Sequence, residues 1–178
     1  MEVVFRRTGA RRYGVTIFRA GYPAIEMNPA PGFDPWMPHD LLHFVIEREL
    51  GMRRGIFGQI AEGGDAGTFH IVPGQEAGRR EAARLRRKAA KRGARLMREG
   101  RVDSAESERV VWVAQSVWMS REKSLGGEAS VDREGLSREM LDRVCAKLDE
   151  ASRLWAALRV GESLTMTWPE APVAGRGR

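Results

Sequence analysis

Two of the three histidines in this 178-residue chain stand four positions apart, and an acidic residue lies close to each. The four residues are His39, Asp40, His43 and Glu47. On a helix that turns about 100° per residue, their side chains fall within an arc of about 100°. The stretch therefore predicts an ionisable stripe on a helix, and it is where the sequence indicates a site for chemistry. Apolar residues lie mostly on the other side: Leu41, Leu42, Val45, Ile46 and Leu50.

Histidines at positions i and i+4 of a helix project side by side and can bind one metal ion, as in the His-Glu-x-x-His helix of metalloproteases. Here the pattern is His39-Asp40-x-x-His43, so Asp40 takes the place of the glutamate that acts there as general base. Its side chain is one methylene shorter, which counts against proteolysis. The sequence predicts a small protein that binds a divalent metal such as zinc. The reaction class would be hydrolysis, with Asp40 orienting a ligand or taking a proton from bound water.

The third metal ligand has two candidates. Glu47 lies one helical turn beyond His43 but ~12 Å along the helix axis from His39, which is a long span for one ion. Glu47 could instead orient His43 without touching the metal. His70, in a predicted strand or extended segment, would give a three-histidine site with an open position for water. The sequence leaves both candidates open.

The same residues also have a purely structural interpretation. Asp40 falls in the first helical turn, where the helix dipole favours an acid. His43 and Glu47 form an ordinary i,i+4 pair, and His39 could hydrogen-bond within the proline-rich lead-in of residues 21–37. Two acids on one stripe and a rigid segment before it strengthen the case for a functional site, so both interpretations stay open.

The stretch from Pro38 to Glu47, followed by Gly55-Ile56-Phe57-Gly58, resembles a group of small uncharacterised bacterial proteins. Those proteins have a His-Asp-x-x-His-x-x-x-Glu helix followed by a Gly-aromatic-Gly turn, and the resemblance covers residues 36–65. It implies that the two histidines and the two acids of the stripe act as a set. It implies no particular activity.

Composition limits the remaining possibilities. The chain is 42% hydrophobic and 30% charged, which is typical of a globular protein, and it has no apolar run of the ~20 residues that a membrane helix needs. Cys145 is the single cysteine, which excludes disulfides within the chain and thiolate-rich zinc sites and favours a cytoplasmic protein. The N-terminus has no signal-peptide pattern. We expect one domain over residues 1–169 and a disordered tail over residues 170–178.

A basic helix predicted over residues 75–100 supplies an alternative function. The net charge of +6 permits an anionic partner, and this helix could bind nucleic acid or an acidic protein without any enzymatic role. Its apolar stripe is thin, and no aromatic residue lies among its charges to stack on bases. These features favour a solvated surface helix over a nucleic-acid interface.

The pattern of the whole chain predicts an α+β fold. Polar and apolar residues alternate near both chain ends, which indicates a small antiparallel sheet whose last strand pairs with the N-terminal hairpin. Helical spacing in between predicts three to four helices packed on that sheet. The predicted strands are residues 2–8, 12–20, 25–27, 68–72 and 163–168. The predicted helices begin between Asp34 and Pro38, with Asp34-Pro35 as a capping pair, at residue 75, at Asp103, which forms a capping-box pattern with Glu106, and after Ser137. One or two further helical turns are predicted from Ile56 to Ala61.

Overall fold

The computed structural model describes residues 1–64, 68–72, 79–99, 101–123 and 135–169. Within these residues the chain forms five helices and one five-stranded antiparallel sheet, which confirms the α+β prediction. The expected count of three to four helices is exceeded because the short turn near Ile56 is a helix in its own right. The predicted tail of residues 170–178 lies outside the described residues.

The sheet is built from both ends of the chain. Strands β1 (Glu2–Gly9) and β2 (Arg12–Phe18) form the predicted hairpin. Strand β5 (Ser163–Thr167) pairs with β1, as its alternating pattern predicts. Strands β3 (Ile25–Met27) and β4 (His70–Ile71) extend the other side, so the strand order is β4-β3-β2-β1-β5.

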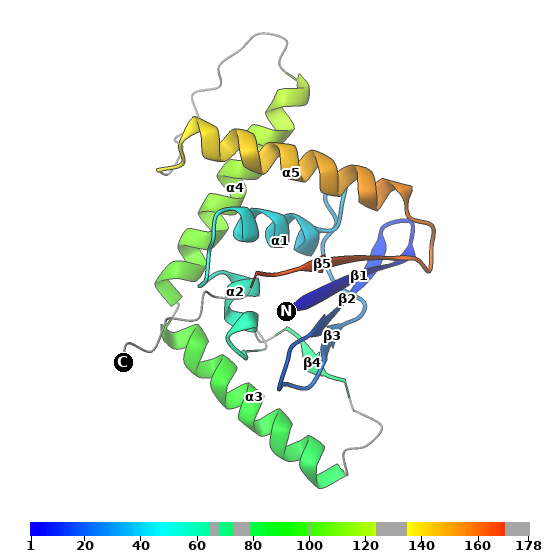
Figure 1. The fold of residues 1–178 in the computed structure, drawn as a ribbon, viewed down its shortest axis with the longest axis vertical. Coiled ribbons are helices and arrows are strands. Elements are labelled where there is room, and N and C mark those ends of the chain that lie inside the picture. Colours follow the sequence, from blue (N-terminus) through cyan, green and yellow to red (C-terminus); the bar gives the residue numbers. More distant parts are fainter. Residues whose placement is uncertain (65–67, 73–78, 100, 124–134, 170–178) are drawn as a thin grey trace, which may run out of the picture.

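Five helices complete the described fold (Figure 1). Helix α1 lies between the sheet and α5 in this view, α4 crosses both helices, and α3 extends away from the rest. Because α1 packs against α5, α4 and α2, every residue from Leu41 to Glu47 is buried. The bounds are α1 His39–Glu49, α2 Ile56–Ala61, α3 Arg79–Glu99, α4 Arg101–Lys123 and α5 Arg138–Ala157.

The two ends of α1 are set by different features. The helix begins at His39, and its N-cap residue is Pro38, which provides no side-chain cap. The prediction of Asp34 as the capping residue is wrong, because the Asp34 carboxylate faces His39 instead. At the other end Gly51 takes a φ of +66°, a left-handed conformation that glycine adopts without strain, and the chain leaves the helix.

The long C-terminal helix follows its sequence signals closely. Ser137 caps α5 by accepting a hydrogen bond from the backbone N–H of Met140 at 3.2 Å. The buried residues of α5 recur at helical spacing and include Leu141, Leu148 and Trp155, which join the core beneath the helix. None of the described helices combines the length and hydrophobicity needed to span a bilayer.

Candidate functional site

Four ionisable side chains form a continuous row that runs from the segment before α1 to the last turn of that helix. Asp34 Oδ2 lies 3.0 Å from His39 Nδ1, and His39 Nε2 lies 3.0 Å from His43 Nε2. On the other side of the second ring, His43 Nδ1 lies 3.6 Å from Glu47 Oε1. The two imidazoles therefore face each other through Nε2, while each Nδ1 lies toward a carboxylate.

The row runs from the surface into the core. The His39 side chain is 43% exposed, whereas that of His43 is 2% exposed and that of Glu47 is fully buried. This gradient follows from the position of α1, whose second turn and beyond are covered by α5, α4 and α2. The exposed end of the row is therefore the end that carries His39.

The buried carboxylate of Glu47 joins α1 to α2. Its two oxygens accept hydrogen bonds from the backbone N–H groups of Ile56 at 2.9 Å and Phe57 at 2.8 Å. These are unpaired donors in the first turn of α2, which Glu47 satisfies from another helix. Gly55 makes room for this contact, because a Cβ at that position would lie 2.4 Å from the Glu47 carboxyl carbon. Position 55 is therefore a glycine because the Glu47 side chain occupies the space that a Cβ there would need.

Helix α4 holds the outer end of the row. The side-chain amide of Gln115 donates a hydrogen bond to Asp34 Oδ1 at 2.8 Å, and Trp36 packs edge-on against Trp118. These contacts fix the segment before α1 on α4. The carboxylate of Asp34 is therefore positioned by a residue far along the chain as well as by its own turn.

The Asp34–His39 contact shifts both groups toward their charged forms. Burial raises the pKa of Asp34, but the hydrogen bond and charge of His39, with the hydrogen bond from Gln115, outweigh it and lower that pKa. The hydrogen bond to Asp34 raises the pKa of His39 against the opposing effect of burial. Protonated His39 is thus stabilised by the neighbouring carboxylate.

One further carboxylate approaches the facing nitrogens from α4. Glu108 Oε2 lies 3.8 Å from His43 Nε2, and the Glu108 side chain is 59% exposed. More than half of this side chain is therefore in contact with solvent. The site therefore has a candidate third ligand that comes from a different helix than the two histidines.

Asp40 points away from this row. Its carboxylate accepts a short hydrogen bond from the hydroxyl of Tyr13 on β2. Burial raises the pKa of Asp40, and the hydrogen bond from Tyr13 offsets only part of that effect. Burial and then the charge of Asp40 raise the pKa of the Tyr13 hydroxyl well above its ordinary range, so the hydroxyl stays a donor. This contact fastens α1 to the sheet and does not favour a role for Asp40 with a metal-bound water.

The two candidate third ligands from the sequence lie in different places. Glu47 is close to His43, but on its Nδ1 side and with both oxygens engaged by α2. His70 lies on β4 at the edge of the sheet, where its Nε2 is 3.8 Å from Glu26 Oε1 of β3. The structure does not bring His70 to the two histidines, so the three-histidine arrangement does not fit this fold.

Sequence reasoning missed three residues of this neighbourhood. The sequence indicates Asp34 only as a helix cap, and no motif in the sequence includes Glu108 or Gln115. The last two have no local signal, because they reach the row only through the packing of α4 against α1. The one usable signal was the helical spacing of seven between Glu108 and Gln115, which places them on the same face of α4.

The facing of the two Nε2 atoms has a chemical consequence. A neutral imidazole carries its proton on one ring nitrogen, and a carboxylate beside Nδ1 favours the proton there. Both Nε2 atoms then present lone pairs to each other at 3.0 Å, an arrangement that a shared cation, either a proton or a metal ion, relieves. Among the described residues, however, no group of three or more His, Cys, Asp or Glu side chains is already placed to hold a metal ion.

Comparison with known proteins finds no matching family model, no similar curated protein and no similar solved structure. The candidate site is therefore described by its own geometry alone, and the resemblance to the uncharacterised bacterial proteins stays a prediction.

Proposed function

We propose that this chain is a metal-binding protein whose site is formed by His39 and His43 at the start of α1. The observation that supports the proposal is the facing of the two Nε2 atoms at 3.0 Å, with a carboxylate beside each Nδ1. Carboxylates in those positions are the usual partners of histidines that bind zinc, since they fix the ring orientation and raise ligand basicity. Asp34 would serve His39 in this way through its hydrogen bond, whereas Glu47, 3.6 Å from His43 Nδ1 and outside hydrogen-bond distance, would act on His43 through its charge.

The separation of the two nitrogens is compatible with one divalent ion. Zinc binds imidazole nitrogen at about 2.1 Å, so two such bonds span 3.0 Å at an angle of about 90° and ~3.4 Å at the tetrahedral angle. A small rotation of the half-exposed His39 ring covers that difference. The buried His43 ring needs no movement, because its Nε2 already lies toward His39.

Glu108 is the proposed third ligand. Its carboxylate is 3.8 Å from His43 Nε2, a little farther than two ligands of one tetrahedral zinc ion lie from each other. Because the side chain is exposed, it can close that distance at little cost. Two histidines and one carboxylate would leave positions for water, so metal-dependent hydrolysis is the reaction class that we attach to the proposal. We assign Asp40 to the positioning of α1 rather than to the reaction.

The experiment is a metal titration of protein without a polyhistidine tag. The wild type should bind about one equivalent of zinc, and His39→Ala and His43→Ala should each weaken binding at least ~100-fold. Glu108→Gln should weaken it by a smaller factor, about 10-fold or more. Equilibrium dialysis followed by elemental analysis measures all four proteins under the same conditions.

The third histidine supplies the matched control. His70→Ala removes an exposed imidazole outside the row, so it should leave zinc binding unchanged. Circular dichroism shows whether each variant keeps its fold. Binding of less than ~0.1 equivalent by the wild type after zinc is supplied, or an equal loss in His70→Ala and His39→Ala, would contradict the proposal.

A further inference from the structure

A second candidate site lies at the opposite end of α1 from the histidines. A cavity of about 410 Å³ opens between the end of α1, the start and end of α2, the end of β2 and the end of β5. Its volume falls within the range of pockets that hold small organic molecules. Neither His39 nor His43 lines it, and Arg48 on its wall lies ~14 Å along the helix axis from His39.

The cavity wall carries more positive than negative side chains. Three arginines line it, Arg19, Arg48 and Arg53, against one acid, the exposed Glu62, although Arg48 is paired with Glu49 beside the wall. Because Arg19 is buried, solvent screens its charge less than that of an exposed side chain, so a small anion is favoured inside over a neutral molecule or a cation.

Two of these arginines are held in place by the protein itself. Arg19 is buried and donates hydrogen bonds to the carbonyl oxygens of Ile60 at 2.7 Å and Gly64 at 2.6 Å. The Arg48 guanidinium donates a hydrogen bond to the Glu49 carboxylate at 2.9 Å and lies over the ring of Phe44. Their positions need no ordering when a ligand enters, which lowers the entropic cost of binding. Arg53 is exposed at the mouth, where it can turn toward an incoming anion.

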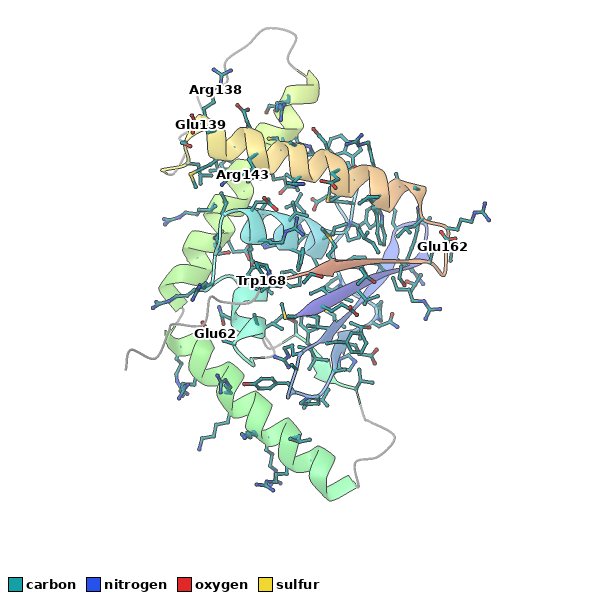
Figure 2. The ribbon with its side chains drawn as sticks, viewed as in Figure 1. Glu62, Arg138, Glu139, Arg143, Glu162 and Trp168 are labelled. Carbon is teal, nitrogen blue, oxygen red and sulfur yellow. The ribbon has the colours of Figure 1, made fainter. Side chains whose placement is uncertain are left out.

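Aromatic rings supply the other part of the wall. Trp168 lines the cavity, and its indole is fixed between Phe44 and Phe57. Tyr22 lies on the β2 side, with the Arg19 guanidinium over its ring at 5.0 Å from the ring centroid. Figure 2 shows Trp168 and Glu62 close to α2, well apart from Arg138 at the start of α5. Apolar ring atoms beside guanidinium groups suit a ligand that has both a planar ring and a negative charge.

We propose that this cavity binds a small organic anion that carries an aromatic ring, with Arg53 closing on the anionic group and Tyr22 and Trp168 contacting the ring. The charged group of the ligand would lie toward Arg53, because Arg48 is already paired with Glu49. The proposal does not depend on metal binding, because the histidine row takes no part in it.

Phenyl phosphate is the probe, titrated by calorimetry into the full chain at about 150 mM salt with EDTA present to remove metal. Binding should be measurable below ~1 mM, and inorganic phosphate and phenol should each bind at least ~10-fold more weakly. Arg53→Gln should weaken phenyl phosphate binding about 10-fold, while Arg53→Lys, which keeps the charge but loses the planar fork of donors, should weaken it less than Arg53→Gln does. Tyr22→Leu should reduce the preference for phenyl phosphate over inorganic phosphate.

Arg138→Gln is the matched control, since Arg138 is 77% exposed and lies far from the cavity (Figure 2). It should leave the affinity unchanged. An equal loss in Arg138→Gln and Arg53→Gln would show binding to net charge alone and would overturn the proposal. Absence of binding at ~10 mM phenyl phosphate would do the same, as would equal affinities for phenyl phosphate and inorganic phosphate. Because EDTA is present throughout, failure here leaves the metal proposal standing, and failure of the metal titration leaves this one standing.

Discussion

The ionisable stripe on α1 and the basic stripe on α3 look alike in sequence, but the first is largely buried and the second is exposed. Both place charged or titratable residues at helical spacing. On α1, His43 and Glu47 are buried and face partners at hydrogen-bonding or ion-pair distance. On α3, the side chains of Arg84, Arg87 and Lys91 are exposed. Figure 1 shows α3 extending away from the sheet and the other helices.

The difference shows what turns a row of charged residues into a candidate site. Charge density alone favours α3, yet exposed charges are screened by salt and hydrated by water. The α1 row has fewer ionisable groups, but the fold buries one side of it and brings Asp34 and Glu108 to the other. Convergence from several segments, rather than the number of charges, makes the α1 row the candidate site.

The largest expected effect comes from removing the buried carboxylate of that row. Glu47→Ala leaves the backbone N–H groups of Ile56 and Phe57 buried without acceptors, so we expect a loss of about 3 kcal/mol in the free energy of unfolding. Glu47→Gln keeps one acceptor oxygen and should lose less. Urea unfolding followed by circular dichroism measures both variants.

Glu139→Ala, an exposed acid in the first turn of α5, is the control and should change stability by less than ~0.5 kcal/mol. If Glu47→Ala were as stable as this control, Glu47 would be no more structural than a surface charge. That result would contradict the view that the buried stripe on α1 contributes more to stability than exposed charges do.

A smaller effect is expected in the pH dependence of the stability of the metal-free protein. The pKa of His39 is raised above its ordinary 6.5, so its stabilisation is complete below pH 6.5 and is lost as pH rises through the folded-state pKa. The pKa of Asp34 is lowered from 3.8, so its stabilisation is present above pH 3.8 and is lost as pH falls through the folded-state pKa. Stability from this pair should therefore be greatest between these two values.

The size should be modest, about 0.5 kcal/mol, because the His39 side chain is 43% exposed and solvent screens the pair. Asp34→Asn should flatten the profile across the His39 titration in EDTA-treated protein. Thermal unfolding at a series of pH values measures it. A profile for Asp34→Asn that matches the wild type would show that the contact stores no charge-dependent stability.

The smallest effect is expected on α3. Replacing Arg84, Arg87, Lys91 and Arg98 together by Gln should change stability by less than ~0.5 kcal/mol, because these side chains are exposed. Binding to duplex DNA should be weak at low salt and absent at about 150 mM salt, in both the wild type and the variant. Micromolar binding at 150 mM salt that the variant lacks, with a log–log slope of about −0.9 per phosphate, would instead make α3 a nucleic-acid interface.

Much of the fold was predictable because its signals are local. The hairpin of β1 and β2, the cap Ser137 and the alternation before Pro169 each lie within a few residues of what they determine. The spacing of His39 and His43 was equally local, so the pair was found from sequence. Its partners Gln115 and Glu108 were not, because only the docking of α4 brings them close.

Misassignments arose where tertiary contacts competed with local preferences. Asp34 before Pro35 is a good capping pair, but its carboxylate binds His39 and Gln115, and the helix starts later. Asp103 and Glu106 resemble a capping box, yet α4 already begins at Arg101. In both places a local pattern indicates where the helix should begin, but the helix begins at a different residue.

The hydrogen bond between Asp34 and Gln115 joins residues that are 81 positions apart, whereas the two histidines are four apart. Local contacts form early in folding, and contacts across long stretches of chain wait for loop closure. During synthesis, α1 can form with its histidines before α4 has left the ribosome. The nascent chain should therefore expose the imidazole pair before α4 is present, and under the metal proposal an ion bound at that stage would have two protein ligands instead of three.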